Sequence, residues 1–239
     1  MNFPIRAGSP PADTRPTQEW LSLRGHAVVI DGAFGPATRR AVTAYQRAAA
    51  LPTTGEVDSR TWLHLTMPLA LADAPLPPFI EDVGVAAVEL AKQHLAQHPR
   101  EVGGQNRGPW VRHYMGGNEG AAFAWCAGFA CHLLTRAFAH VGRALPIRWS
   151  WSCDELATRA RDAGLLTDAK SASHVPPGSL FLVRGAAPGD WTHTGLVLSD
   201  DGEVIHTCEG NTNDDGAREG YEVCARYRGK ARLDVVIWP

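Results

Sequence analysis

The fold is decided by the apolar run FAWCAGFACHLLTRAFAHVG (residues 123–142) and by the change of pattern that follows it. The run is too short to cross a membrane and is typical of a buried helix. After PPG (176–178) the pattern changes to short apolar strands: SLFLV, HTGLVLS, EVIHT, EVCARYR and LDVVIW. Helices followed by an antiparallel sheet predict an α+β domain, with a hairpin turn at Asp200-Asp201-Gly202.

A second unit precedes this domain. It contains three short helical pieces, TQEWLSLRGH (17–26), PATRRAVTAYQRAAAL (36–51) and SRTWLHLT (59–66), separated by turn-rich segments. The stretch MPLALADAPLPPF (67–79) has four prolines and little periodicity. We therefore predict a small all-α domain over residues 1–67, a Pro-rich linker over 68–79 and the α+β domain over 80–239. The α+β domain should begin with a helix over 83–98.

Composition limits the class of partner. The chain has 239 residues and a formal net charge of −2, so no basic field argues for binding to nucleic acid. No stretch of 18 apolar residues predicts a membrane span, and MNFPIRAGSPPADTRP lacks the apolar core of a signal peptide. We expect a monomer that is made in the cytoplasm and reaches an external site of action through another system.

Three residues in chain order predict nucleophilic catalysis. Cys126 follows a glycine-rich segment and should lie in the first turn of its helix, where the partial positive charge favours a thiolate. His193 opens a strand, and its neutral imidazole can take the thiol proton. Glu209 ends the next strand and can orient His193, while Asn211 should lie on the same side. This pattern predicts a thiol hydrolase.

Other interpretations of these residues stay open. Cys126 can also be a buried core cysteine, and Glu209 an exposed loop carboxylate. A zinc enzyme could use His193, His206, Cys208 and Glu209, although no HxxxH pattern supports it. We interpret Cys131, His206 and Cys208 as packing residues. Most other histidines, including His94 and His113, we interpret as surface or capping residues.

The N-terminal unit resembles a peptidoglycan-binding domain of the small three-helix type. The matching residues are Asp-Gly-x-Phe-Gly-x-x-Thr at 31–38, Ala-Val-x-x-Tyr-Gln at 41–46 and Gly-x-Val-Asp-x-x-Thr-Trp at 55–62. Nearly all of them are turn, cap or core residues. The resemblance therefore implies the fold and, less directly, bacterial peptidoglycan as the partner. The alternative is a domain that has kept the fold and lost the ligand.

The C-terminal unit resembles the CHAP group of cysteine peptidoglycan hydrolases and amidases, which is papain-like and NlpC/P60-like. The matching segments are WCAGFA (125–130), PPGSLFLV (176–183), HTGLVL (193–198) and CEGNT (208–212). The resemblance implies a papain-like α+β fold with Cys126 as nucleophile, His193 as base, Glu209 as orienter and Asn211 as a fourth member. It requires no cofactor.

The segment GGQNRGPWVRHYM (103–115) extends the second resemblance and makes Asn106 and Tyr114 candidates for oxyanion or substrate contacts. Trp151 and Trp191 are candidates to line the cleft. Some CHAP proteins bind calcium through aspartates ahead of the cysteine. Because residues 99–125 contain only two acids, Glu101 and Glu119, we predict no calcium site and no other metal.

Together the two resemblances predict a peptidoglycan hydrolase that cleaves an amide bond of the peptide stem. A phage endolysin and an antibacterial effector delivered by secretion machinery, with its own immunity protein, fit equally well. The alternative from another class is a wall-binding protein whose hydrolase domain is inactive.

Overall fold

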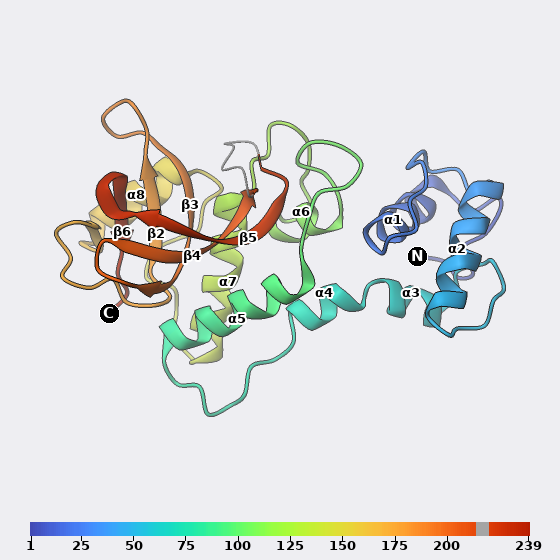
Figure 1. Cartoon of the computed structure of the whole chain (residues 1–239), viewed down its shortest axis with the longest axis horizontal. Helices are drawn as coiled ribbons and strands as arrows, with labels where there is room; N and C mark the ends of the chain where they lie inside the picture. The colour runs from blue at the N-terminus through green and yellow to red at the C-terminus, as the bar shows by residue number, and fades with distance from the viewer. Residues whose placement is uncertain (214–219) are drawn as a thin grey trace.

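The computed structural model describes residues 1–213 and 220–239 and has the predicted α+β architecture (Figure 1). Small helices gather at the N-terminal end of the molecule, and an antiparallel sheet with its own helices forms the rest. The helices are α1 (Pro11–Leu23), α2 (Pro36–Ala48), α3 (Ser59–Leu65), α4 (Met67–Ala72), α5 (Val83–Gln97), α6 (Pro109–Tyr114), α7 (Cys126–His140) and α8 (Cys153–Asp162). The strands are β1 (Leu166–Asp168), β2 (Leu180–Arg184), β3 (Trp191–Asp200), β4 (Val204–Thr212), β5 (Glu222–Gly229) and β6 (Leu233–Val236), and a short 3-10 helix (Lys230–Arg232) precedes β6.

Two glutamines fix the turns of the N-terminal unit. Gln18 on α1 accepts a hydrogen bond from the Gly32 amide at 2.8 Å, and Gln46 on α2 accepts one from the Gly55 amide at 2.9 Å. Both glycines have positive φ angles, 77° and 72°, which explains why the two turns require glycine. Asp58 then caps α3 by accepting a backbone hydrogen bond at 2.7 Å. The predicted three-helix arrangement is confirmed.

The strands of the described residues form one antiparallel sheet in the order β1-β6-β2-β3-β4-β5. The predicted hairpin turn joins β3 to β4, where the Gly202 amide donates to the Asp200 carboxylate at 2.9 Å. The register of this hairpin pairs Leu196 with Cys208. The start of β3 therefore lies beside the end of β4.

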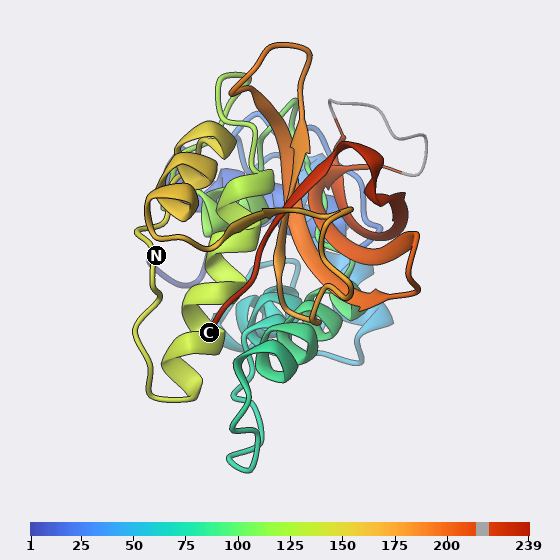
Figure 2. The same cartoon turned by 90° about the vertical axis from the view of Figure 1, so that its left-hand side faces the viewer.

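Helix α7 is the central helix of the second domain. It packs against β3, β4 and α5, and it lies with α8 on one side of the sheet (Figure 2). Close packing depends on two glycines, since a Cβ at Gly210 would lie 2.7 Å from Phe129 and one at Gly128 would lie 2.4 Å from the sulfur of Met115. Neither α7 nor any other helix in the described part of the chain combines the length and apolarity needed to span a bilayer.

The segment between the two units contains a short helix. Residues 67–72 form α4, with a proline in its first turn, so the Pro-rich segment predicted as a linker over 68–79 begins as a helix. A proline is compatible with this helix, because its missing N–H costs nothing in the first turn.

The N-terminal helices also contact the second domain directly. Trp20 of α1 meets Trp110 of α6 edge to face, with ring centroids 5.9 Å apart. Arg112 of α6 donates to the buried carboxylate of Glu19 at 3.2 Å and to Glu119 at 2.6 Å. The two units are therefore docked through aromatic and ionic contacts in addition to the chain that joins them.

Candidate active site

Cys126 is the first residue of α7, as predicted. The preceding residue, Trp125, is fully buried, and its indole N–H donates to Glu101 at 2.9 Å, which fixes the entry into the helix. The first amides of a helix have no intrahelical acceptor, and they carry the positive end of the helix dipole. The Cys126 sulfur therefore lies where a negative charge is stabilised.

His193 and Glu209 meet across the β3–β4 pair. The Nε2 atom of His193 lies 2.8 Å from Oε2 of Glu209, which is fully buried. His193 is the third residue of β3, so the prediction that it opens the strand is wrong by two residues. The hairpin register nevertheless brings the imidazole to the carboxylate, and the predicted pairing of His193 with Glu209 is present in the structure.

Glu209 has two further partners that the sequence did not reveal. Arg228 of β5 donates to both carboxylate oxygens at 2.6 Å, and Thr207 donates its hydroxyl to Oε1 at 2.6 Å. These bonds hold a charged carboxylate inside the protein. Burial would raise the pKa of Glu209, but the hydrogen bonds from Arg228 and His193 outweigh it and lower the pKa to about 2.

Cys153, the first residue of α8, is a third residue that the sequence did not reveal. Its sulfur lies 4.0 Å from the sulfur of Cys126. A hydrogen bond from Cys153 and the charge of His193 lower the pKa of Cys126 well below its usual 9.0. Cys153 itself is left as the thiol, because that hydrogen bond and burial raise its pKa.

The neighbours of His193 raise its pKa. Burial lowers its pKa, but the negative charge of Cys126 and the hydrogen bonds to Cys126 and Glu209 outweigh this effect and raise the pKa to about 9. These two shifts favour a Cys126 thiolate beside a His193 imidazolium at neutral pH. Such a pair has a nucleophile ready to attack and a proton ready to donate.

The two asparagine candidates lie close to the site but have structural contacts. Asn211 is buried in a bulge of β4 with φ at 54°, and its Oδ1 atom has no hydrogen-bond partner among the described residues. The Asn106 side-chain amide donates to the Ala121 carbonyl at 3.3 Å. This bond braces the loop before α7 and uses one of the two N–H donors of the amide. No contact of either asparagine with Cys126 or His193 is observed within the described residues.

The aromatic candidates divide into two buried residues and one exposed residue. The Tyr114 hydroxyl bonds to Nδ1 of His94 at 2.8 Å inside the core, and Trp191 donates its indole N–H to Asp234 at 2.9 Å. Trp151 is 37% exposed, lies two residues before Cys153 and packs near Trp149, with ring centroids 5.5 Å apart. Of the three, Trp151 is available to contact a substrate.

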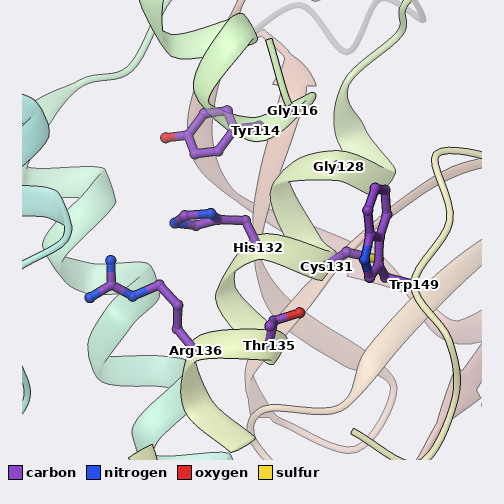
Figure 3. Close-up of a pocket in the computed structure, with 8 residues that line it drawn as sticks. All are labelled: Tyr114, Gly116, Gly128, Cys131, His132, Thr135, Arg136 and Trp149. Atoms are coloured by element: carbon purple, nitrogen blue, oxygen red, sulfur yellow. The ribbon is translucent and has the colours of Figure 1, made fainter. Parts of the chain in front are cut away.

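A cavity of about 200 Å³ lies along α7 (Figure 3). Tyr114, His132 and Arg136 lie on one side of it, and Trp149 lies on the other. Cys126 is not among its lining residues. The cavity therefore adjoins the helix that carries Cys126 without containing the nucleophile.

The zinc set considered from the sequence is not gathered at one point. Thr207 and Glu209 share one face of β4, because their side chains are hydrogen-bonded, whereas His206 and Cys208 alternate to the other face. His206 stacks on Tyr227 at 4.6 Å, and Cys208 is fully buried. A different group with metal-ligand geometry exists in the described residues: Asp73, His94 and His132. His94 is fully buried, so its interpretation as a surface residue is wrong.

Comparison with known proteins bears on the N-terminal unit. Neither the curated proteins nor the solved structures contain a match to the chain. Residues 11–65 match the family model named Putative peptidoglycan binding domain. This match confirms the resemblance predicted for the first unit and supports association of the protein with the bacterial cell wall.

Proposed function

We propose that this protein is a cysteine-dependent peptidoglycan hydrolase that cleaves an amide bond of the peptide stem. The observation that carries the proposal is the Cys126–His193–Glu209 arrangement, in which a thiolate at a helix N-terminus faces an imidazolium held by a buried carboxylate. The match of residues 11–65 to a peptidoglycan-binding domain supports peptidoglycan as the substrate of the proposed reaction. The resemblance of residues 80–239 to CHAP domains is consistent with the same chemistry.

The reaction follows from the charges of the site. The Cys126 thiolate attacks the carbonyl carbon of the amide, and the carbonyl oxygen becomes an oxyanion near the free amides of α7. His193 gives its proton to the departing amine, which leaves an acyl-enzyme and a neutral imidazole. The imidazole then takes a proton from water, hydroxide attacks the acyl group, and the carboxylic acid leaves as the thiolate is restored. Glu209 holds the imidazole ring throughout, with Arg228 and Thr207 fixing the carboxylate.

Two exposed surfaces suit the polymer. Trp149 and Trp151 are 50% and 37% exposed and precede Cys153, so sugar or peptide groups can stack on them close to the nucleophile. On the N-terminal unit, a cavity of about 310 Å³ is lined by Phe34, Arg39 and Glu56 among others. Its mixed charges suit a peptide stem, which carries both an amine and carboxylates.

The test is release of soluble fragments from purified cell wall by the wild type, by Cys126→Ala and by Lys92→Ala, a control at an exposed position on α5. We expect release by the wild type and the control and none by Cys126→Ala. Wild-type activity that survives Cys126→Ala would refute the thiol mechanism. Wall binding without release in every sample would favour a wall-binding protein with an inactive second domain.

Mass spectrometry of the fragments would identify the bond that is cut. A new amine on the stem and an intact glycan are expected for an amidase or endopeptidase, whereas new reducing sugars would contradict the proposal. Genes for lysis or for a secretion spike next to this one would distinguish a phage endolysin from a delivered effector.

A further inference from the structure

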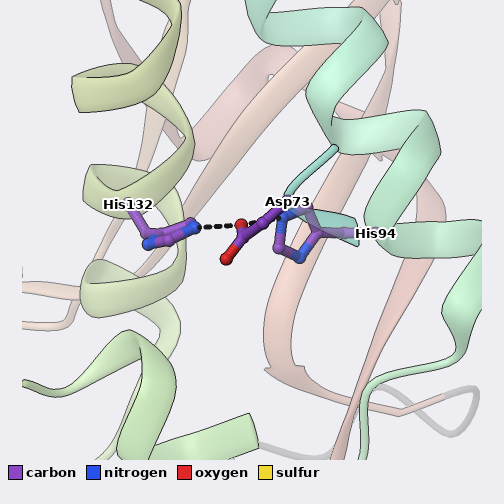
Figure 4. A group of neighbouring side chains, drawn as sticks. All are labelled: Asp73, His94 and His132. Carbon is purple, nitrogen blue, oxygen red and sulfur yellow. Dashed lines mark hydrogen bonds and ion pairs between the residues drawn. The ribbon is translucent and has the colours of Figure 1, made fainter. Parts of the chain in front are cut away.

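Four side chains from different parts of the chain converge on the carboxylate of Asp73, just after α4. His94 comes from α5, His113 from α6, and His132 and Arg136 from α7. Figure 4 shows the carboxylate between the rings of His94 and His132. None of these residues takes part in the arrangement around Cys126.

The distances fit a small cation with imidazole and carboxylate ligands. Oδ1 of Asp73 lies 3.0 Å from Nε2 of His132 and 3.6 Å from Nε2 of His94, and the three ligand atoms lie within 4.8 Å of one another. Zinc binds such atoms at about 2.0–2.2 Å, so two tetrahedral ligands stand about 3.3 Å apart. The two shorter separations lie on either side of this value, and small side-chain shifts would satisfy all three bonds.

His94 gives an independent indication that a ligand is missing. It is fully buried, its Nδ1 atom is paired with the Tyr114 hydroxyl, and its Nε2 atom points at Asp73 without a hydrogen bond. A buried polar atom without a partner is costly, and a cation between Nε2 and the carboxylate would satisfy it. Tyr114 would then play the part of the outer partner that fixes the orientation of a metal-binding imidazole.

The surroundings favour a divalent metal over a simple ion pair. Three imidazole nitrogens lie within 3.6 Å of one carboxylate, so two of them can serve as ligands while the third contacts the carboxylate. Imidazole nitrogen with carboxylate oxygen is a ligand set that suits zinc, whereas calcium and magnesium prefer oxygen alone. The second oxygen of Asp73 lies 2.9 Å from Nε2 of His113, which can hold the carboxylate in its orientation.

We propose that Asp73, His94 and His132 bind one zinc ion, with His113 orienting the carboxylate. His132 and Arg136 also line the cavity in Figure 3, so the proposed site borders a cavity from which water could supply the fourth ligand. Because Asp73 follows α4 and the histidines belong to α5 and α7, the ion would fasten the segment between the two units onto the second domain.

Arg136 makes the proposal sharply testable. Its guanidinium pairs with Oδ1 of Asp73 and also donates to the Asp73 carbonyl at 2.7 Å. A cation bound at Oδ1 would compete with this charge, so Arg136→Ala should tighten zinc binding. If the cluster is only an ion-pair network, Arg136→Ala would lower the stability of the protein and would not strengthen zinc binding.

The experiment measures zinc binding to the full-length, chelator-treated protein by calorimetry, with visible absorption of bound cobalt as a second readout. We expect one ion per chain, at least about 100-fold weaker binding in His132→Ala, tighter binding in Arg136→Ala and no change in His174→Ala. His174 is an exposed histidine outside the cluster. His132→Gln, checked by circular dichroism, separates loss of the ligand from loss of the fold.

Cys126→Ala identifies the site that binds the ion. Binding that is unchanged in Cys126→Ala and lost in His132→Ala supports the proposal. Binding that disappears in Cys126→Ala, or that persists in His132→Ala, would overturn it, as would the absence of stoichiometric binding to the wild type.

Discussion

Replacement of Glu209 by glutamine would test the electrostatic core of the candidate active site. The glutamate side chain is fully buried and accepts four hydrogen bonds, two from Arg228 and one each from His193 and Thr207. Glutamine has nearly the same shape but no charge. The variant would leave the Arg228 guanidinium without its counter-ion and would weaken the hold on the His193 imidazolium.

The expected loss follows from the pKa of Glu209. The fall from the usual 4.5 to about 2 corresponds to roughly 3 kcal/mol of preference for the charged form in the folded protein, at about 1.4 kcal/mol per pH unit. Because the folded pKa is depressed, this contribution is fully present above pH 4.5 and is lost as the pH falls through about 2. Glu209→Gln should therefore be about 3 kcal/mol less stable at neutral pH, and the difference should shrink in acid.

Urea denaturation of the wild type and Glu209→Gln at pH 7 and at pH 3 measures both quantities. Glu203→Gln serves as the control, because Glu203 is exposed next to the β3–β4 turn and should change stability by less than about 0.5 kcal/mol. In the same variant, an NMR titration should show a lower pKa for His193. Equal stability of Glu209→Gln and the wild type at pH 7, or a difference that is as large at pH 3 as at pH 7, would refute the reasoning.

Three further substitutions test other parts of the structure. Cys153→Ala removes the hydrogen bond to Cys126, so the pH midpoint for alkylation of Cys126 by iodoacetamide should rise; an unchanged midpoint would contradict the assigned role. Glu19→Gln leaves Arg112 without its buried partner and should cost about 1–3 kcal/mol in urea denaturation, with faster proteolysis between the domains. Gly128→Ala would place a Cβ 2.4 Å from the Met115 sulfur and should lower the melting temperature by at least the equivalent of about 1–3 kcal/mol, whereas a neutral effect would show that α6 can shift.

The parts of the site that could be predicted from sequence depend on local signals. The glycines before Cys126 and the apolar run after it mark the start of a helix, and α7 begins at that residue. The Asp-Asp-Gly turn fixes the register of β3 and β4, and that register brings His193 to Glu209. The turn residues therefore account for most of the side-chain positions that could be predicted correctly.

The residues that sequence reasoning missed are joined only by tertiary packing. Arg228 reaches Glu209 from β5, which begins at Glu222, whereas β4 ends at Thr212. Cys153 reaches Cys126 from α8, because the start of α8 packs beside the start of α7. Alternation within β5 restricts Arg228 to one face of the sheet, but nothing in the sequence names the partner on that face. Such contacts depend on how helices and strands pack, which has no pattern of fixed spacing.

The Asp73 cluster shows the same limit and changes how the two units should be viewed. Asp73 lies within the predicted linker, yet it contacts His94, His113 and His132 of the second domain. With the contacts between α1 and α6, this anchors the N-terminal unit at two points. A flexible tether raises the local concentration of substrate at every distance within its reach. A docked wall-binding unit instead presents the polymer to Cys126 at one separation and orientation. In the proposed function, the spacing of stems along a glycan strand would then select which amide is cut. Substitution of Glu19, which weakens the interface, would first widen the range of amides that are cut and only then lower the rate of the reaction.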